Sequence, residues 1–375
     1  MTRRPWQAIE RPRRRRLPAL LPGVLLLAAL LAGCQGGSEA DHRLIDYQQR
    51  LAAALGVEAP ATPPPRNIAA FPGRDARRFT IDEIREGLLD VYALRRCGIV
   101  RLVAQRNSQL GKVAAPSQRW LYELALWRQL QACWNDTSAG DLAKDDRQRL
   151  ADLLARKTRQ LPRASWNGLF DSSEWTGSFS RASAPLPLGG TPSLEAQLAA
   201  LGYLRRMVLH QYDPRWTPDS ATLENHLKAL RDAPLTARIL RSLLLATRRL
   251  DDLDPVIAAR LADPAFCAPD TAAEPPADER LAAALDGQES QRLRADLDSL
   301  ARDAQRWLTA VDALLSAFTV SRPAIDAYRR HWLSLTHPEA PWPAFRTARA
   351  QHAALRERLR QRCLAPAGPS GDRGA

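Results

Sequence analysis

The densest group of polar side chains in the sequence lies in two short runs, residues 106–112 and 116–123. The members that could do chemistry are Arg106, Asn107, Ser108, Arg119, Tyr122 and Glu123. Cationic, amide and hydroxyl groups together could bind an anionic or glycan ligand through charge-assisted hydrogen bonds. The alternative is a polar network between two helices that fixes their register. These six residues therefore form a candidate polar site, and the sequence leaves both interpretations open.

A second candidate site is a group of aromatic residues within residues 162–192, a stretch rich in Ser, Gly and Asp that predicts a long loop. Its members are Trp166, Phe170, Trp175 and Phe179. Exposed aromatic side chains would stack on sugar rings or anchor a partner protein. Alternatively, the loop packs its aromatic side chains back onto the helices.

Common catalytic and nucleotide-binding signatures are absent from the sequence. It contains no Gly-x-Ser-x-Gly, His-Glu-x-x-His, Walker or Gly-x-Gly-x-x-Gly motif. The six histidines are scattered, and His331 and His337 would not share a helix face, so we predict no metal site and no cofactor. Asp251, Asp252 and Asp254 could supply an acid and a base, but capping and solvation beside a helix end explain them better. We assign no catalytic residue.

Cys34 has the most specific predicted chemistry in the chain. Residues 1–16 contain seven arginines and one glutamate, and residues 17–32 are uncharged and apolar, which is the pattern of a signal peptide. This apolar run is shorter than the roughly 20 residues that a membrane-spanning helix needs. Residues 31–34 then resemble a bacterial lipobox, in which the cysteine thiol receives a diacylglycerol. We expect cleavage after Gly33 and two or three acyl chains, such as palmitate, on Cys34, which would anchor the protein stably.

The predicted compartment follows from the residue after the lipidated cysteine. Gln35 stands there instead of an aspartate, which by similarity to the usual sorting rule predicts the inner leaflet of the outer membrane, facing the periplasm. Residues 34–375 contain 47 basic and 40 acidic residues, a net charge of +7. No basic run of five or more remains, and export removes nucleic acid as a partner. The expected partners are the membrane, through the lipid anchor, and envelope proteins or glycan.

Four further cysteines, Cys97, Cys133, Cys267 and Cys363, follow Cys34. An even number in an oxidising compartment predicts two disulfides with three possible connectivities, and free buried thiols are the alternative. In an antiparallel hairpin, the register that brings Cys97 level with Cys133 also brings Arg106 close to Glu123. We therefore predict a Cys97–Cys133 bridge and an Arg106–Glu123 ion pair, and a Cys267–Cys363 bridge by elimination.

The composition predicts an all-α, multi-helix bundle, because Ala, Leu and Arg dominate while Val and Ile are scarce. A capping box of Thr80 and Glu83 would open a long helix that runs to Leu110, with a kink expected at Gly87 and Gly98. Apolar residues between positions 293 and 318 recur with a period near 3.5, which indicates a packing seam. Helices are expected over residues 42–55, 80–110, 118–134, 142–161, 194–210, 221–231, 235–261, 293–318, 323–335 and 344–364.

The expected elements divide the chain into four parts. Residues 1–33 are the signal peptide, and residues 34–79 hold the lipid anchor, a short helix and a proline-rich linker that keeps the body off the bilayer. Residues 80–364 form the helical body, which could divide into 80–262 and 277–364, and residues 365–375 are a disordered tail.

Several short motifs surround the candidate polar site and the aromatic stretch. They are Arg96-Cys97-Gly98, Arg106-Asn107-Ser108, Leu110-Gly111-Lys112, Pro116-Ser117, Tyr122-Glu123 and Cys133, followed by Trp166-Asn167 and Glu174-Trp175. This pattern resembles a family of gammaproteobacterial lipoproteins that is known only as a domain of unknown function, DUF3080. The resemblance covers most of the chain after Cys34. It implies an envelope lipoprotein and no known activity.

The sequence thus predicts an outer-membrane-anchored periplasmic lipoprotein that acts as an interaction or scaffold protein of the envelope. One alternative is an enzyme acting on cell-wall or lipid substrates, which would need a deep pocket lined by the candidate polar residues. Another is a carrier of an apolar ligand, which would need a cavity on the order of several hundred Å³ between the helices.

Overall fold

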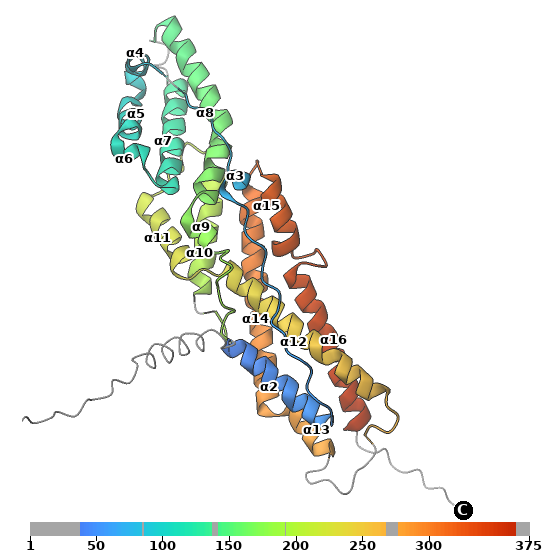
Figure 1. Ribbon diagram of the computed structural model, residues 1–375. Helices are drawn as coiled ribbons and strands as arrows, with labels where there is room; N and C mark the ends of the chain where they lie inside the picture. Colours follow the sequence, from blue (N-terminus) through green and yellow to red (C-terminus); the bar gives the residue numbers. More distant parts are fainter. Residues whose placement is uncertain (1–37, 85, 137–141, 192, 268–276, 365–375) are drawn as a thin grey trace, which may run out of the picture. The chain divides into compact units, whose positions relative to one another are not determined.

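The computed structural model describes residues 38–84, 86–136, 142–191, 193–267 and 277–364. Every regular element in these ranges is a helix, which confirms the predicted all-α fold (Figure 1). The predicted signal peptide, Cys34 and the tail from residue 365 lie outside the described residues. The helices are α2 (Glu39–Ala54), α3 (Arg74–Arg77), α4 (Leu88–Ala93), η1 (Arg95–Cys97), α5 (Val100–Asn107), α6 (Gln109–Lys112), α7 (Pro116–Asn135), α8 (Lys144–Phe170), α9 (Ser173–Gly177), α10 (Leu194–Leu209), α11 (Ser220–Asp232), α12 (Thr236–Ala262), α13 (Ala277–Asp286), α14 (Gln288–Ala317), α15 (Pro323–Tyr328), η3 (Arg329–Leu333) and α16 (Pro341–Cys363).

One hydrophobic core connects these helices, with members from Ala40 in α2 to Leu359 in α16. Helix α7 packs against α8, α10 packs against α11 and α14, and α12 packs against α16. The predicted seam is α14, whose apolar side chains from Leu293 to Leu314 are buried, as its heptad-like spacing indicated. Residues 80–262 and 277–364 both contribute to this core. All of the described core residues lie at or after Ser38.

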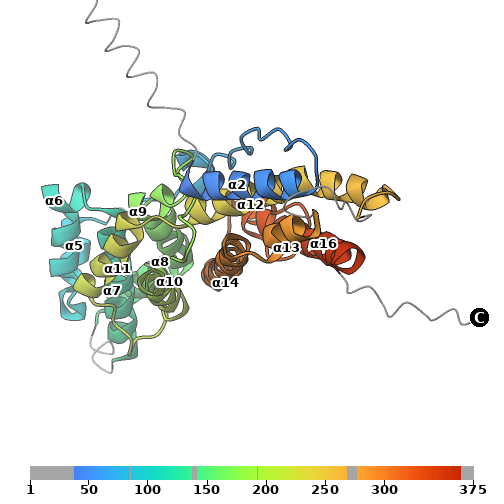
Figure 2. The same ribbon diagram turned by 90° about the horizontal axis from the view of Figure 1, so that it is seen from below.

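The first described helix, α2, is held in this core by buried polar contacts. Tyr47 Oη lies 2.7 Å from His352 Nε2, and His352 Nδ1 lies 2.6 Å from an oxygen of Asp254. Arg249, only 2% exposed, donates through Nε to Asp41 at 2.8 Å. Figure 2 shows α2 beside α12, which carries Arg249 and Asp254. The predicted helix over residues 42–55 is confirmed, and it is an integral part of the body.

The proline-rich segment after α2 is not a free spacer, and this part of the prediction is wrong. Residues 58–73 are extended, as the prolines indicated, but they lie against the helices. Ile68 is buried, and the ring of Phe71 stacks on that of Phe179 with centroids 4.0 Å apart. Pro63 O accepts a hydrogen bond from Arg249 Nη1 at 2.9 Å. Figure 1 shows this segment running along the body to α3, so the body begins at α2 rather than at residue 80.

The single long helix predicted over residues 80–110 is also wrong. Residues 80–84 are not helical, and α4, η1, α5 and α6 follow as separate short pieces. Gly98 has a φ of +68°, a left-handed conformation that ends η1 and that glycine adopts without steric cost. Ser108 then caps α6, because its Oγ accepts a hydrogen bond from Gly111 N at 3.1 Å.

Helix α8 continues through Pro162 to Phe170, so the loop predicted over residues 162–192 is wrong in its first part. Proline lacks the N–H group that would bond to the carbonyl of Thr158. The hydroxyl group of Tyr212 donates to that carbonyl instead, at 2.8 Å. The hydrogen bond that proline removes is therefore replaced by a side chain, and the helix continues.

All four aromatic residues of the second candidate site are buried: Trp166, Phe170, Trp175 and Phe179. The rings of Trp166 and Phe170 stack with centroids 4.0 Å apart, and Trp166 Nε1 donates to Arg77 O at 2.7 Å. The alternative in which these side chains pack onto the helices is confirmed. An exposed aromatic platform for sugars or partner proteins at these residues is therefore wrong.

The structure contains two disulfides, Cys97–Cys133 and Cys267–Cys363, both with the predicted pairing. The first joins η1 to α7, and the second joins the segment after α12 to the end of α16. None of the helices in the described ranges combines the length and the apolar composition that a bilayer crossing requires.

Candidate functional site

The candidate polar residues lie at a cleft of about 800 Å³. One wall consists of α4, α5 and α6, and the other consists of α7 and α8. Non-helical residues between 78 and 84, together with Glu86, complete the lining. Of the six candidates, Arg106, Asn107, Arg119, Tyr122 and Glu123 line the cleft. Ser108 does not, since its hydroxyl group caps α6 and donates to Gln105 O.

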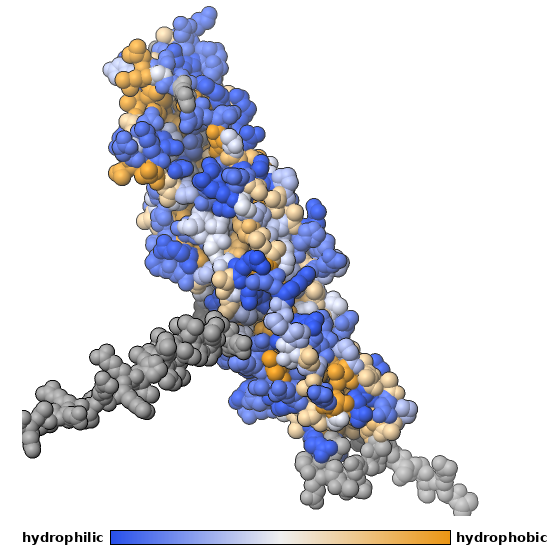
Figure 3. Space-filling model, in the orientation of Figure 1, coloured by the Kyte–Doolittle hydropathy of each residue, from blue (hydrophilic) through white to orange (hydrophobic). Residues whose placement is uncertain are grey.

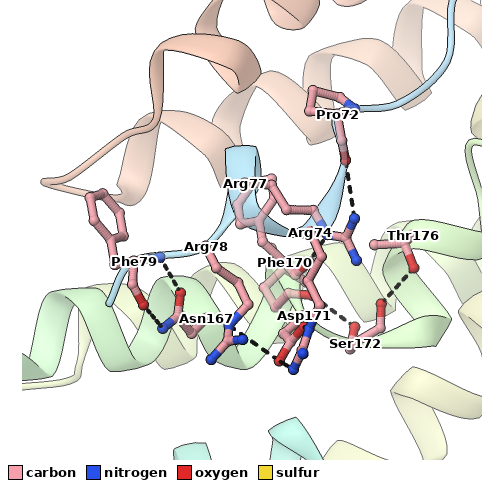
Figure 4. Close-up of polar contacts among 11 residues, drawn as sticks. Pro72, Arg74, Arg77, Arg78, Phe79, Asn167, Phe170, Asp171, Ser172 and Thr176 are labelled. Carbon is pink, nitrogen blue, oxygen red and sulfur yellow. Dashed lines mark hydrogen bonds and ion pairs between the residues drawn. The ribbon is translucent and has the colours of Figure 1, made fainter. Parts of the chain in front are cut away.

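Helix α8 holds residues 79–82 in place through its side chains. Asn167 Oδ1 accepts from Phe79 N at 2.9 Å, and Asn167 Nδ2 donates to Phe79 O at 2.8 Å (Figure 4). Gln160 Nε2 donates to Asp82 O at 2.8 Å. These contacts satisfy backbone groups in a non-helical conformation, which explains why Thr80 and the residues after it do not start a helix.

Most of the carboxylates in the lining form ion pairs with neighbouring elements. Arg149 of α8 lies 2.9 Å from Asp90 of α4, and Lys157 of α8 lies 2.8 Å from Glu123 of α7. Glu123 therefore pairs with Lys157, and the predicted Arg106–Glu123 ion pair is wrong. The hairpin register placed the two cysteines correctly, but the helix breaks at Gly98, so the register does not continue to Arg106 in α5.

One end of the cleft is strongly basic. Asp171 accepts from Arg74 at 2.7 Å and lies 3.5 Å from Arg78, as Figure 4 shows. Burial raises the pKa of the Asp171 carboxyl group, but the hydrogen bond from Arg74 and the charge of Arg78 outweigh it, so the pKa is below its ordinary value. Arg106 and Arg119 add two further cations at this end.

Arg106 and Arg119 have no carboxylate within ion-pair distance among the described residues. Arg106 Nη1 donates to Gly111 O at 2.8 Å, and Arg119 Nη2 donates to Lys112 O at 3.4 Å. The Nε atom of Arg119 is buried and has no hydrogen-bond partner. Burial, and then the charge of Arg106, lowers the pKa of Arg119. These two guanidinium groups are therefore available to an anion.

The remainder of the lining mixes charged and apolar side chains. Its apolar members come from both walls and from residues 79–84, and they are Phe79, Ile81, Ile84, Val91, Leu94, Ile99, Val103, Trp120, Leu126 and Leu153. Tyr122 lies on the same wall as Arg119, and burial, with the neighbouring charge of Glu123, raises its pKa to about 12. Tyr122 is therefore a neutral hydrogen-bond donor at ordinary pH. The cleft is amphipathic, with apolar side chains in its lining and a cationic end.

Several lining residues were missed by sequence reasoning, namely Arg78, Arg149, Lys157, Asn167 and Asp171. They come from segments far from residues 106–123 in the sequence, and no spacing rule connects them. Of these residues, only Asn167 could have been found from the sequence, because it stands in the Trp166-Asn167 motif.

The acidic cluster at residues 251–254 lies inside α12 and does not cap a helix, so that interpretation is wrong. Asp252 pairs with Arg248, and Asp254 pairs with His352. No group of His, Cys, Asp and Glu in the described part of the chain could hold a metal ion.

The fold and the cleft define a disulfide-bonded, all-α protein with an amphipathic cavity. The chain belongs to the family described as a protein of unknown function, DUF3080, whose model matches residues 44–365. No curated protein and no solved structure matches the chain.

Proposed function

We propose that this protein is an envelope lipoprotein, anchored through Cys34 in the inner leaflet of the outer membrane, whose periplasmic body binds an anionic amphiphile in the cleft. The observation that carries the binding proposal is the amphipathic lining, in which Arg106 and Arg119 lack a carboxylate partner among the described residues. A volume of about 800 Å³ falls in the range of small-molecule sites. A phosphate or carboxylate group would pair with the two arginines, and an apolar chain would contact the aliphatic lining.

Binding is better supported than catalysis. Four of the carboxylates in the lining are engaged by basic side chains: Glu86, Asp90 and Glu123 by residues of α8, and Asp171 by Arg74. An enzyme of cell-wall or lipid substrates would need a cleft carboxylate that is available as an acid or base. A scaffold role with envelope proteins or glycan stays a prediction.

The lipidation proposal rests on the sequence around Cys34, and the position of α2 adds a geometric consequence. Three residues separate Cys34 from Ser38, the N-cap of α2, and the four steps along the chain from Cys34 to Ser38 span at most about 14 Å. A lipid on Cys34 would therefore hold the folded body close to the bilayer surface, without a long spacer. Mass spectrometry of the protein from membranes would detect the acylated cysteine, and a Cys34→Ser variant released from membranes would support the anchor.

The binding proposal is tested with two fluorescent probes, dansyl-labelled undecanoic acid and its uncharged amide. We expect both to bind, because both can occupy the apolar lining. Replacing Arg106 and Arg119 together by Gln should lower affinity for the acid at least about tenfold and leave the amide unchanged, since charge-assisted hydrogen bonds are lost. The control is Arg302→Gln, an exposed arginine on α14 that is not among the lining residues.

A Val103→Trp variant, which fills the cleft, should weaken binding of both probes. Equal affinity of the acid for the double variant and the wild type would refute the anion site. If Val103→Trp leaves the affinity for both probes unchanged, the cleft is not the binding site.

A further inference from the structure

The wall formed by residues 88–113 has a second face that points away from the cleft. Val91, Leu94 and Val103 line the cleft, whereas Leu88 and Leu89 are 84% and 83% exposed. The other large apolar side chains exposed on this segment are Tyr92, Leu110 and Val113. These five residues are called the outer face below.

The apolar side chains of the outer face gather on one side of the molecule. Figure 3 shows them as two groups, one over α4 and one over α6. Leu110 is 82% exposed and Val113 is 77% exposed, so these side chains protrude with few neighbours. Isolated exposed apolar residues are common, but five within one short segment need a partner to cover them.

The charge around the outer face is one-sided. Residues 88–113 contain five basic residues and one acidic residue, Asp90, which is already paired with Arg149. Arg95 lies over the ring of Tyr92 at 4.8 Å and also donates to Tyr92 O. Arg96 and Arg101 are exposed and have no carboxylate within ion-pair distance among the described residues. The surface thus combines protruding leucines with free cations.

These features decide between two kinds of partner. A protein interface buries a broad, shape-complementary surface, whereas the outer face consists of single side chains that protrude from short helices. Protruding leucines beside basic residues match the interface of an anionic bilayer, where the apolar side chains insert and the cations contact lipid headgroups. We propose that the outer face of residues 88–113 docks on an anionic membrane surface.

This docking would place one wall of the cleft against the bilayer, next to a source of amphiphiles. It does not depend on Cys34, because the residues involved belong to the folded body. It also does not depend on a ligand in the cleft, because the residues of the outer face do not line it.

The test uses the chain from Ser38 onward, which contains the described core, and measures its cosedimentation with lipid vesicles. We expect binding to vesicles that contain phosphatidylglycerol, and at least about tenfold weaker binding to pure phosphatidylcholine or in high salt, because headgroup contacts are screened. Replacing Leu88 and Leu89 together by Ser should weaken partitioning by at least about tenfold, since both side chains would leave the bilayer interface.

Two matched controls keep the result specific. Leu209→Ser removes an apolar side chain that is 51% exposed on α10, and it should leave partitioning unchanged. Arg302→Gln should also have no effect, whereas replacing Arg96 and Arg101 by Gln should weaken binding to anionic vesicles several-fold. Circular dichroism confirms that each variant is folded.

Three results would overturn the proposal. The first is that the protein does not bind anionic vesicles. The second is that Leu209→Ser weakens vesicle binding as much as the Leu88 and Leu89 substitutions do. The third is that the protein self-associates without binding vesicles, and that the Leu88 and Leu89 substitutions abolish this self-association. The last result would identify a second copy of the chain as the partner.

Discussion

Replacing Arg249 by Ala tests how α2 is held in the body. Arg249 is 2% exposed and contacts Asp41 at 2.8 Å and Pro63 O at 2.9 Å. The alanine variant leaves a largely buried carboxylate and a carbonyl without their donor. Removing one partner of a buried ion pair costs about 3 to 5 kcal/mol. We expect a loss of this size in the free energy of unfolding.

Arg292→Ala is the control, because Arg292 pairs with Glu289 on α14 at 2.9 Å and both side chains are more than half exposed. Exposed pairs contribute about 1 kcal/mol or less. Urea denaturation followed by far-UV circular dichroism compares the two variants at neutral pH. Equal losses for Arg249→Ala and Arg292→Ala would contradict the reasoning. So would strict additivity of Arg249→Ala and Asp41→Ala, because residues that share an ion pair must couple.

Three further predictions follow from the cleft and its walls, and the first has a matched control on α10. Gly168→Ala should lower the free energy of unfolding by about 1 to 3 kcal/mol in thermal melts, because the new Cβ would lie 2.8 Å from a tryptophan of α7. The control, Gly202→Ala on α10, has open space around the new Cβ and should raise the free energy of unfolding by up to about 1 kcal/mol. Replacing Cys97 and Cys133 by Ala should cost about 4 kcal/mol and weaken binding of the dansyl acid, because the bridge fixes one wall of the cleft. Asp171→Asn should lower the free energy of unfolding at neutral pH, because the lowered pKa of the Asp171 carboxyl group means that its ionised form stabilises the fold. The difference in the free energy of unfolding between this variant and the wild type should shrink as the pH falls below about 4, because protonation of Asp171 removes that stabilisation.

Each of these predictions has a result that would contradict it. A higher free energy of unfolding for Gly168→Ala would show that α7 and α8 can move apart at this position without losing stability. Unchanged probe affinity without the first disulfide would show that the wall is held by other contacts. A difference between Asp171→Asn and the wild type that does not change with pH would show that the carboxylate does not act through its charge.

The sequence predicted elements best where a pattern was long and uninterrupted. The seam of α14, the helices α10 to α12 and the pairing of both disulfides all follow from apolar spacing, glycine and proline positions, and cysteine number. The prediction failed at Pro162, because the donor that replaces the missing N–H group is Tyr212, fifty residues away in the chain. It failed again after Thr80, where side chains of α8 bind the backbone in a non-helical conformation.

The candidate site was predicted in part. Arg106, Arg119, Tyr122 and Glu123 were recognised as a polar group because they are close in the sequence. Their surroundings were not, since Arg78, Lys157 and Asp171 reach the cleft from other segments. The partner of Glu123 is therefore Lys157 rather than Arg106.

By itself the sequence determined the helical class and the cysteine pairs, because both depend on local propensity, regular spacing and a small number of combinations. Tertiary structure alone decided that the aromatic residues are buried, that the proline-rich segment packs on the body, and that Arg106 and Arg119 face a cavity without a carboxylate partner in the described chain. These outcomes depend on which distant groups satisfy buried polar atoms and fill apolar space. Such groups are brought together only when the helices pack.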